Sequence, residues 1–239
     1  MSKRRKELTV EENVAILVDG GFYQRRARSL WGMKTAEERA NELYEYCKLH
    51  LYSPHQPANR LYRIFYYDCP PSTANVYHPF KRTNVSLSRT ELYRWMTDFH
   101  EALKSKRKVA LRLGELSAVN SYTLRPEAVK KLFGGERSLS AINEDDFVLN
   151  IGQKGVDMRI GLDIASMAYK KQVTQIVLIS GDSDFVPAAK LARREGVDFI
   201  LDSMQAVIKP SLSEHVDGLR NKINFYNSRQ NQSIQLENP

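Results

Sequence analysis

The first apolar run of the chain ends in an aspartate. Residues 14–18 are followed by Asp19, and then by Gly20, Gly21 and Phe22. An apolar strand that ends in Asp and continues into two glycines places a carboxylate at the carboxyl edge of a sheet, with little bulk around it. Ligands bind at that edge in open α/β sheets. Taken alone, the pattern is better explained by a helix cap and a tight turn.

Two more aspartates stand two residues apart after the most apolar short run, residues 176–179. The sequence there continues Ser180, Gly181, Asp182, Ser183, Asp184, Phe185. On a strand-to-helix turn both carboxylates can face one small volume, and their mutual repulsion makes a divalent cation the natural partner. A helix cap is the alternative explanation for Asp184, but a single cap explains one aspartate and not the pair. Ser180 and Ser183 are expected to support these carboxylates.

A fourth aspartate opens the helix that precedes this run, in Lys154-Gly155-Val156-Asp157. Helical spacing puts Asp157 on the same face as Ile164 and Ala168, so it is expected to point inward at the N-terminal end of the helix. Asp163 lies about 120° further round the helix. We therefore assign Asp163 a structural or, at most, a supporting role.

Short apolar runs alternate with helical patterns along the chain, which predicts an α/β fold with a mostly parallel sheet of about five strands. The strands are expected at residues 14–18, 61–67, 109–113, 176–179 and 197–201. Helices are expected near residues 89–106, 155–171 and 185–194. Three stretches do not fit this alternation, at 25–58, 70–106 and 115–148, and the middle one is a candidate lid or cover beside the sheet.

The length of 239 residues suits one α/β domain. We place it at residues 13–226, between a basic arm at 1–12 and a polar tail at 227–239 that we expect to be disordered. No apolar run approaches the roughly 20 residues that span a bilayer, and no signal peptide is evident, which favours a cytoplasmic location. Cys47 and Cys69 are too few for a disulfide scaffold or a cysteine-rich zinc site, so we expect two reduced thiols.

The chain carries a formal charge of +8 and has a pI near 9.4. An excess of Lys and Arg attracts polyanions through counterion release, which makes nucleic acid the expected partner. Lys154, Arg25 and Arg26 stand next to the aspartate motifs and could contact phosphate, although solvation explains each of them taken singly. Homo-oligomerisation stays open.

The three aspartate motifs, in this order, resemble the NYN domain of LabA-like proteins, a branch of the PIN-like nucleases. The resemblance covers residues 13–23 and 152–204, and Tyr66-Tyr67-Asp68 and Leu111-Arg112-Leu113-Gly114 resemble intermediate strands of bacterial members. It implies a PIN-like three-layer fold and a ribonuclease that binds Mg²⁺ or Mn²⁺ through Asp19, Asp157, Asp182 and Asp184. Many members carry Asn at the position of Phe22, so this chain departs from the pattern there.

These observations predict hydrolysis of an RNA phosphodiester by a metal-activated water, because oxygen-only ligation suits Mg²⁺ or Mn²⁺ and argues against zinc. A phosphatase of the haloacid dehalogenase type would have a second Asp where this chain has Gly21. A non-catalytic RNA-binding or regulatory module that keeps the fold and the metal stays open as the alternative, since a fold does not dictate activity.

Overall fold

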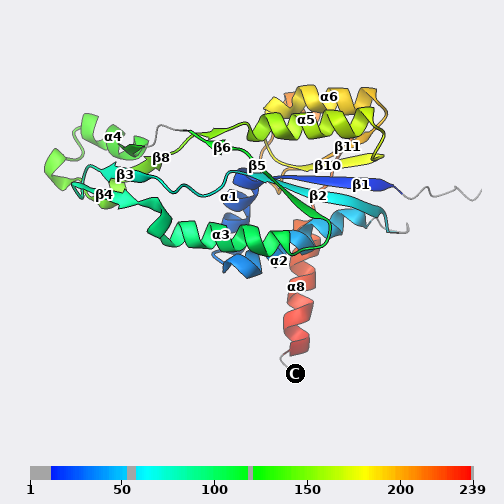
Figure 1. Cartoon of the computed structure of the whole chain (residues 1–239), viewed down its shortest axis with the longest axis horizontal. Coiled ribbons are helices and arrows are strands. Elements are labelled where there is room, and N and C mark those ends of the chain that lie inside the picture. The colour runs from blue at the N-terminus through cyan, green and yellow to red at the C-terminus, as the bar shows by residue number, and fades with distance from the viewer. Residues whose placement is uncertain (1–11, 53–57, 118–120, 238–239) are drawn as a thin grey trace, which may run out of the picture.

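The computed structural model describes residues 12–52, 58–117 and 121–237 and centres on a six-stranded sheet in which every neighbouring pair is parallel (Figure 1). The strand order is β12-β11-β10-β1-β2-β5. The five predicted strands are confirmed, and the sixth, β12, was not predicted because two residues carry no readable pattern. The strands of this sheet are β1 (Asn13–Asp19), β2 (Arg60–Asp68), β5 (Val109–Leu113), β10 (Gln175–Ile179), β11 (Asp198–Asp202) and β12 (Gly218–Leu219).

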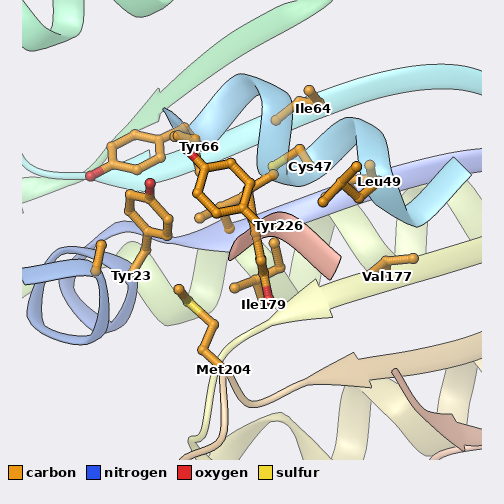
Figure 2. Close-up of a cluster of buried hydrophobic side chains, with 14 of the residues drawn as sticks. Tyr23, Cys47, Leu49, Ile64, Tyr66, Val177, Ile179, Met204 and Tyr226 are labelled. Atoms are coloured by element: carbon orange, nitrogen blue, oxygen red, sulfur yellow. The ribbon is translucent and has the colours of Figure 1, made fainter. Parts of the chain in front are cut away.

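Helices cover both faces of this sheet, so the fold has the three layers expected of a PIN-like domain. One face carries α1 (Gly20–Trp31), α2 (Ala36–Lys48), α3 (Glu91–Lys104) and α8 (Ile223–Glu237). The other carries α5 (Val156–Tyr169), α6 (Val186–Arg194) and α7 (Pro210–Ser213). Alternate residues of β1 enter the two cores, which explains why the strand is apolar throughout. Figure 2 shows part of the first core, where Tyr23, Tyr66 and Tyr226 gather with Ile179.

The insertions at 70–106 and 115–148 build a small lobe beside the sheet (Figure 1). Its strands form two antiparallel pairs, β3 with β4 and β7 with β8. The pairs meet where the His78 ring lies 4.3 Å from Tyr122 and 5.4 Å from Phe147, measured between centroids. The lobe contains β3 (Asn75–His78), β4 (Thr83–Ser86), β7 (Ser121–Leu124), α4 (Pro126–Phe133) and β8 (Phe147–Asn150).

The lobe joins the core through β6 (Glu115–Leu116) and β9 (Gln153–Lys154), which pair antiparallel. The second half of the 70–106 insertion is α3, which packs with α2 over the sheet and so covers it. Short 3₁₀ helices complete the described chain: η1 (Leu49–Leu51), η2 (Leu87–Arg89), η3 (Leu139–Ala141), η4 (Glu144–Asp146) and η5 (Ser183–Phe185).

The tail expected at residues 227–239 continues the last helix. Residues 227–237 belong to α8, which extends away from the body of the domain (Figure 1), and the expected disorder of the tail stays a prediction. The first turn of this helix is fixed by packing, because Ile223 and Tyr226 are buried and the Tyr226 ring lies 4.9 Å from that of Trp31. The predicted basic arm lies outside the described residues, except for Glu12.

Cys47 and Cys69 are both buried and free, as expected. Among the described residues, no helix is long and apolar enough to cross a membrane.

Candidate active site

Asp19 ends β1 at the carboxyl edge of the sheet and caps α1. Its Oδ1 accepts a hydrogen bond from the Phe22 amide at 3.0 Å, and its Oδ2 accepts one from the Ser180 hydroxyl at 3.0 Å. The second bond joins β1 to the end of β10, its neighbour in the sheet. Asp19 therefore caps α1, as the local pattern suggested, and it also links the ends of β1 and β10.

Asp182 shapes the turn after β10. Its Oδ1 accepts from the Asp184 amide at 3.0 Å, and its own amide donates to the Ser180 hydroxyl at 3.3 Å. Asp182 is thus the N-cap of η5, whereas the alternative explanation in the sequence analysis named Asp184 as the cap. Both carboxylates are exposed at this edge of the sheet.

Asp157 lies in the first turn of α5 and is electrostatically coupled to the other three aspartates. Partial burial raises its pKa, and the charges of Asp19, Asp182 and Asp184 raise it further. Burial is also the main cause that raises the pKa of Asp19, with a smaller contribution from Asp182. The Asp157 side chain is exposed, so the inward orientation expected from helical spacing is wrong. It lies in the first helical turn, where the sheet does not cover it.

Two surface pockets border these aspartates. Asp19 and Asp182 line one of them with Phe22, Arg25 and Lys209. Asp157 and Asp184 line the other, between α5 and α6. Each of the two pockets thus borders two of the four aspartates.

Other groups closely approach the glycines of two of these motifs, Gly20 and Gly181. A Cβ on Gly20 would lie 2.5 Å from the Tyr67 carbonyl oxygen, and a Cβ on Gly181 would lie 2.8 Å from the Phe22 ring. Phe22, where the chain departs from the family pattern, thus fills space against the Gly181 backbone and lines the Asp19 pocket.

A family model described as the NYN domain matches residues 13–218. The chain belongs to the NYN family. This family is part of the PIN-like superfamily, and its members have a nuclease-type fold.

Several solved structures resemble the NYN domain at low sequence identity, among them the following two. A protein of unknown function, VPA0982 from Vibrio parahaemolyticus RIMD 2210633, is 15% identical with a TM-score of 0.48, covering 91% of this chain and 96% of that one. A structure titled "Structural Basis for the Mechanism and Regulation of Sir2 Enzymes" is 12% identical with a TM-score of 0.34, covering 94% and 95%. A comparison with curated proteins finds no significant match.

The predicted supporting residues of the NYN domain have distinct surroundings. Ser180 bonds Asp19, and Ser183 accepts a hydrogen bond from the Lys209 ammonium at 3.2 Å. Asp163 instead accepts from the Tyr67 hydroxyl at 2.8 Å and from Arg112 at 2.9 Å, so it ties α5 to β2 and β5. Its role here is structural, one of the two that the sequence analysis allowed.

The three basic residues predicted to contact phosphate also differ in their surroundings. Arg25 is exposed and lines the Asp19 pocket. Arg26 donates twice to the Met204 carbonyl, at 3.1 and 2.8 Å, which commits its guanidinium to a loop of the domain. Lys154 is exposed in β9, three residues before Asp157.

Sequence analysis missed Asp68 as a possible site residue. It ends β2 next to β1, is 5% exposed, and accepts from the Cys69 amide at 2.7 Å and the Tyr66 hydroxyl at 3.2 Å. His100 Nε2 lies 3.3 Å from its Oδ2. Asp68 lines a pocket together with Gly20 and Gly21. The signal that singled out Asp19, an Asp at the end of an apolar strand, applies equally to Asp68.

A divalent cation suits this edge by donor chemistry. Carboxylate oxygens are the ligands of Mg²⁺ and Mn²⁺, and the mutual repulsion that raises the pKa of Asp157 is the repulsion that a cation relieves. In residues 12–52, 58–117 and 121–237, no three His, Cys, Asp or Glu side chains are arranged as a metal site. A divalent cation therefore matches these aspartates in charge and in ligand type.

Proposed function

We propose that this NYN domain is a metal-dependent ribonuclease that hydrolyses phosphodiester bonds of RNA at the edge formed by Asp19, Asp157, Asp182 and Asp184. The observation that carries the proposal is the coupling of Asp157 to the other three carboxylates, in a chain that belongs to a nuclease-type family. A structural cap explains one aspartate at a time and gives no reason for four of them to share an edge.

Hydrogen bonds hold two of the four carboxylates in place. The Phe22 amide and the Ser180 hydroxyl fix both oxygens of Asp19, and the Asp184 amide fixes one oxygen of Asp182. Asp157 is carried by the first turn of α5. Such anchoring holds negative charge in place against repulsion, as a pre-organised site for a cation and a phosphate requires.

These four aspartates would hold Mg²⁺ or Mn²⁺, which supplies an activated water and neutralises charge on the phosphate when it is bound. Arg25 and Lys154 are the predicted side chains for neighbouring phosphates, since both are exposed next to the aspartate motifs. The site lies at an open edge, so an RNA strand can approach it from solvent. A cytoplasmic location stays part of this proposal.

The direct test incubates the purified protein with end-labelled RNA in Mn²⁺, in Mg²⁺ and in EDTA. We expect cleavage only with the divalent ion, and we expect Asp182→Asn to lower the rate at least about a hundredfold, because it removes charge and not core packing. Asp98→Asn, which changes an exposed aspartate of α3, is the matched control and should cleave like the wild type.

Cleavage by a well-folded Asp182→Asn variant at the wild-type rate would contradict the assignment. Wild-type protein that binds RNA and never cleaves it would favour the non-catalytic module instead.

A further inference from the structure

The loop that follows β11 contains two residues with energetically unfavourable backbone angles. Met204 and Gln205 have φ angles of 47° and 60°, in the left-handed backbone region that residues other than glycine rarely adopt. Two such residues in succession persist only where the surroundings hold them, and this kind of strain gathers at functional sites. The loop therefore has a shape that the rest of the domain imposes.

Three contacts hold that shape. The Met204 amide donates to the buried Asp202 carboxylate at 2.7 Å, and Arg26 donates twice to the Met204 carbonyl. The Met204 side chain is fully buried and points into the cluster around Tyr23 and Ile179 (Figure 2). The strained residues are thus fastened to β11, to α1 and to the core.

The loop then runs along the aspartate edge. Ala206, Val207 and Lys209 line the pocket that Asp19 and Asp182 also line. The Lys209 ammonium donates to the neutral Ser183 hydroxyl at 3.2 Å. No carboxylate in the described part of the chain lies within 4.0 Å of it, so it forms no ion pair there.

The same pocket holds a second cation, Arg25, whose charge partly offsets the rise that burial causes in the pKa of Asp19. Lys209 and Arg25 thus line one pocket from different elements, together with the carboxylates of Asp19 and Asp182. Val207, 98% exposed, marks the open side of this loop toward solvent.

We propose that Lys209, presented by the strained loop 203–209, binds a phosphate group of the nucleic acid next to the aspartate edge, with Arg25 as its partner. This inference rests on the proposed function and adds the residue that positions the strand. Lys209 follows the left-handed residues by four positions, in a loop whose path the contacts of Met204 with Asp202 and Arg26 fix. An ammonium is a compact point charge with three donors, which suits a phosphate oxygen.

The experiment measures binding of a short fluorescein-labelled single-stranded RNA by anisotropy, in EDTA, across a series of KCl concentrations. The variants are Lys209→Gln, Lys209→Arg and the matched control Lys190→Gln, an exposed lysine of α6 that does not line this pocket. We expect Lys209→Gln to weaken binding about tenfold and to flatten the slope of log K against log salt by about 0.7, the share of one phosphate on a single strand. Lys209→Arg keeps the charge and should bind like the wild type, as should Lys190→Gln.

Equal affinities and slopes for Lys209→Gln and Lys190→Gln would overturn the inference, and a wild type that still cleaves RNA would leave the proposed function standing. Conversely, a Lys209 effect on binding without any cleavage would keep the phosphate site and remove the nuclease. A wild type that neither binds nor cleaves RNA would overturn both.

Discussion

At the residue scale, Asp19 shows that capping and ligand binding are compatible in one side chain. Each of its oxygens accepts one hydrogen bond, from the Phe22 amide and from the Ser180 hydroxyl. An ionised carboxylate offers about four lone-pair positions, so each oxygen keeps one for a further partner. The capping role of Asp19 is therefore compatible with the proposed binding of a cation.

Asp157 gives a prediction with a definite sign. Its folded-state pKa is raised, so the folded protein holds a proton more tightly than the unfolded chain does. This contribution to stability is present below the unfolded pKa and is lost as pH rises through the folded value. In EDTA at neutral pH, Asp157→Asn should therefore show a small rise in Tm over the wild type, and the difference should shrink as pH falls toward 3.8, the ordinary pKa of an Asp carboxyl.

Thermal melts across this pH range check the prediction, with Asp98→Asn as the control that should follow the wild type. Because Asp157 is exposed, solvent screens the repulsion and the expected rise is small. An Asp157→Asn variant that melts below the wild type at neutral pH would mean that the carboxylate is a stabilising partner, contrary to the coupling argued here.

At the element scale, the position of Asp19 depends on the close contact between the first residue of α1 and β2. Gly20 is the first residue of α1, and β2 pairs with β1 up to Tyr67, opposite Asp19. A Cβ at Gly20 would meet both the Tyr67 carbonyl oxygen and the Tyr66 ring. The sheet pairing fixes that carbonyl, so the helix start would have to move, and Asp19 with it.

We therefore expect Gly20→Ala to destabilise the domain by about 1–3 kcal/mol through overpacking, and to reduce cleavage by displacing Asp19. Gly161→Ala is the matched control: a Cβ there meets nothing within 4 Å, and the residue lies inside α5. It should stabilise the domain by about 0.5–1 kcal/mol. Urea unfolding of both variants decides the matter, and equal effects of the two substitutions would refute the close-approach argument.

At the scale of the whole molecule, binding of a cation at the aspartate edge must appear as global stability. A ligand that binds only the folded state stabilises it by about 2.7 kcal/mol at a hundredfold excess over its Kd. We expect Mn²⁺ or Mg²⁺ to raise the Tm of the wild type, and to raise that of Asp182→Asn by less. Calorimetric scans with increasing metal measure this.

The control for this experiment supplies the same ionic strength as KCl, because salt alone screens the repulsion between the carboxylates. A Tm that responds equally to KCl and to Mn²⁺ would show general screening. That result would remove the physical basis of a cation site.

The sequence by itself determined the layout of this NYN domain. The five predicted strands and the helices that contain Asp157 and Pro187 are present, because the period of the apolar residues and the chemistry of the turns are local properties. A parallel sheet also brings the carboxyl ends of its strands to one edge, which is why Asp19 and Asp182 share an edge. The strand order was not predicted, and Asp19 meets the turn of Asp182 because β10 pairs directly with β1.

The tertiary structure alone decided which neighbouring polar residues serve the site. Arg25 and Arg26 are adjacent in sequence, yet one lines the Asp19 pocket and the other bonds Met204, 178 residues away. Asp163 pairs with Arg112 from β5, and Lys209 reaches Ser183 from a loop that no local pattern marks. These contacts join segments that are distant in sequence. They therefore form only when the sheet and its helices pack together, and the local sequence does not predict them.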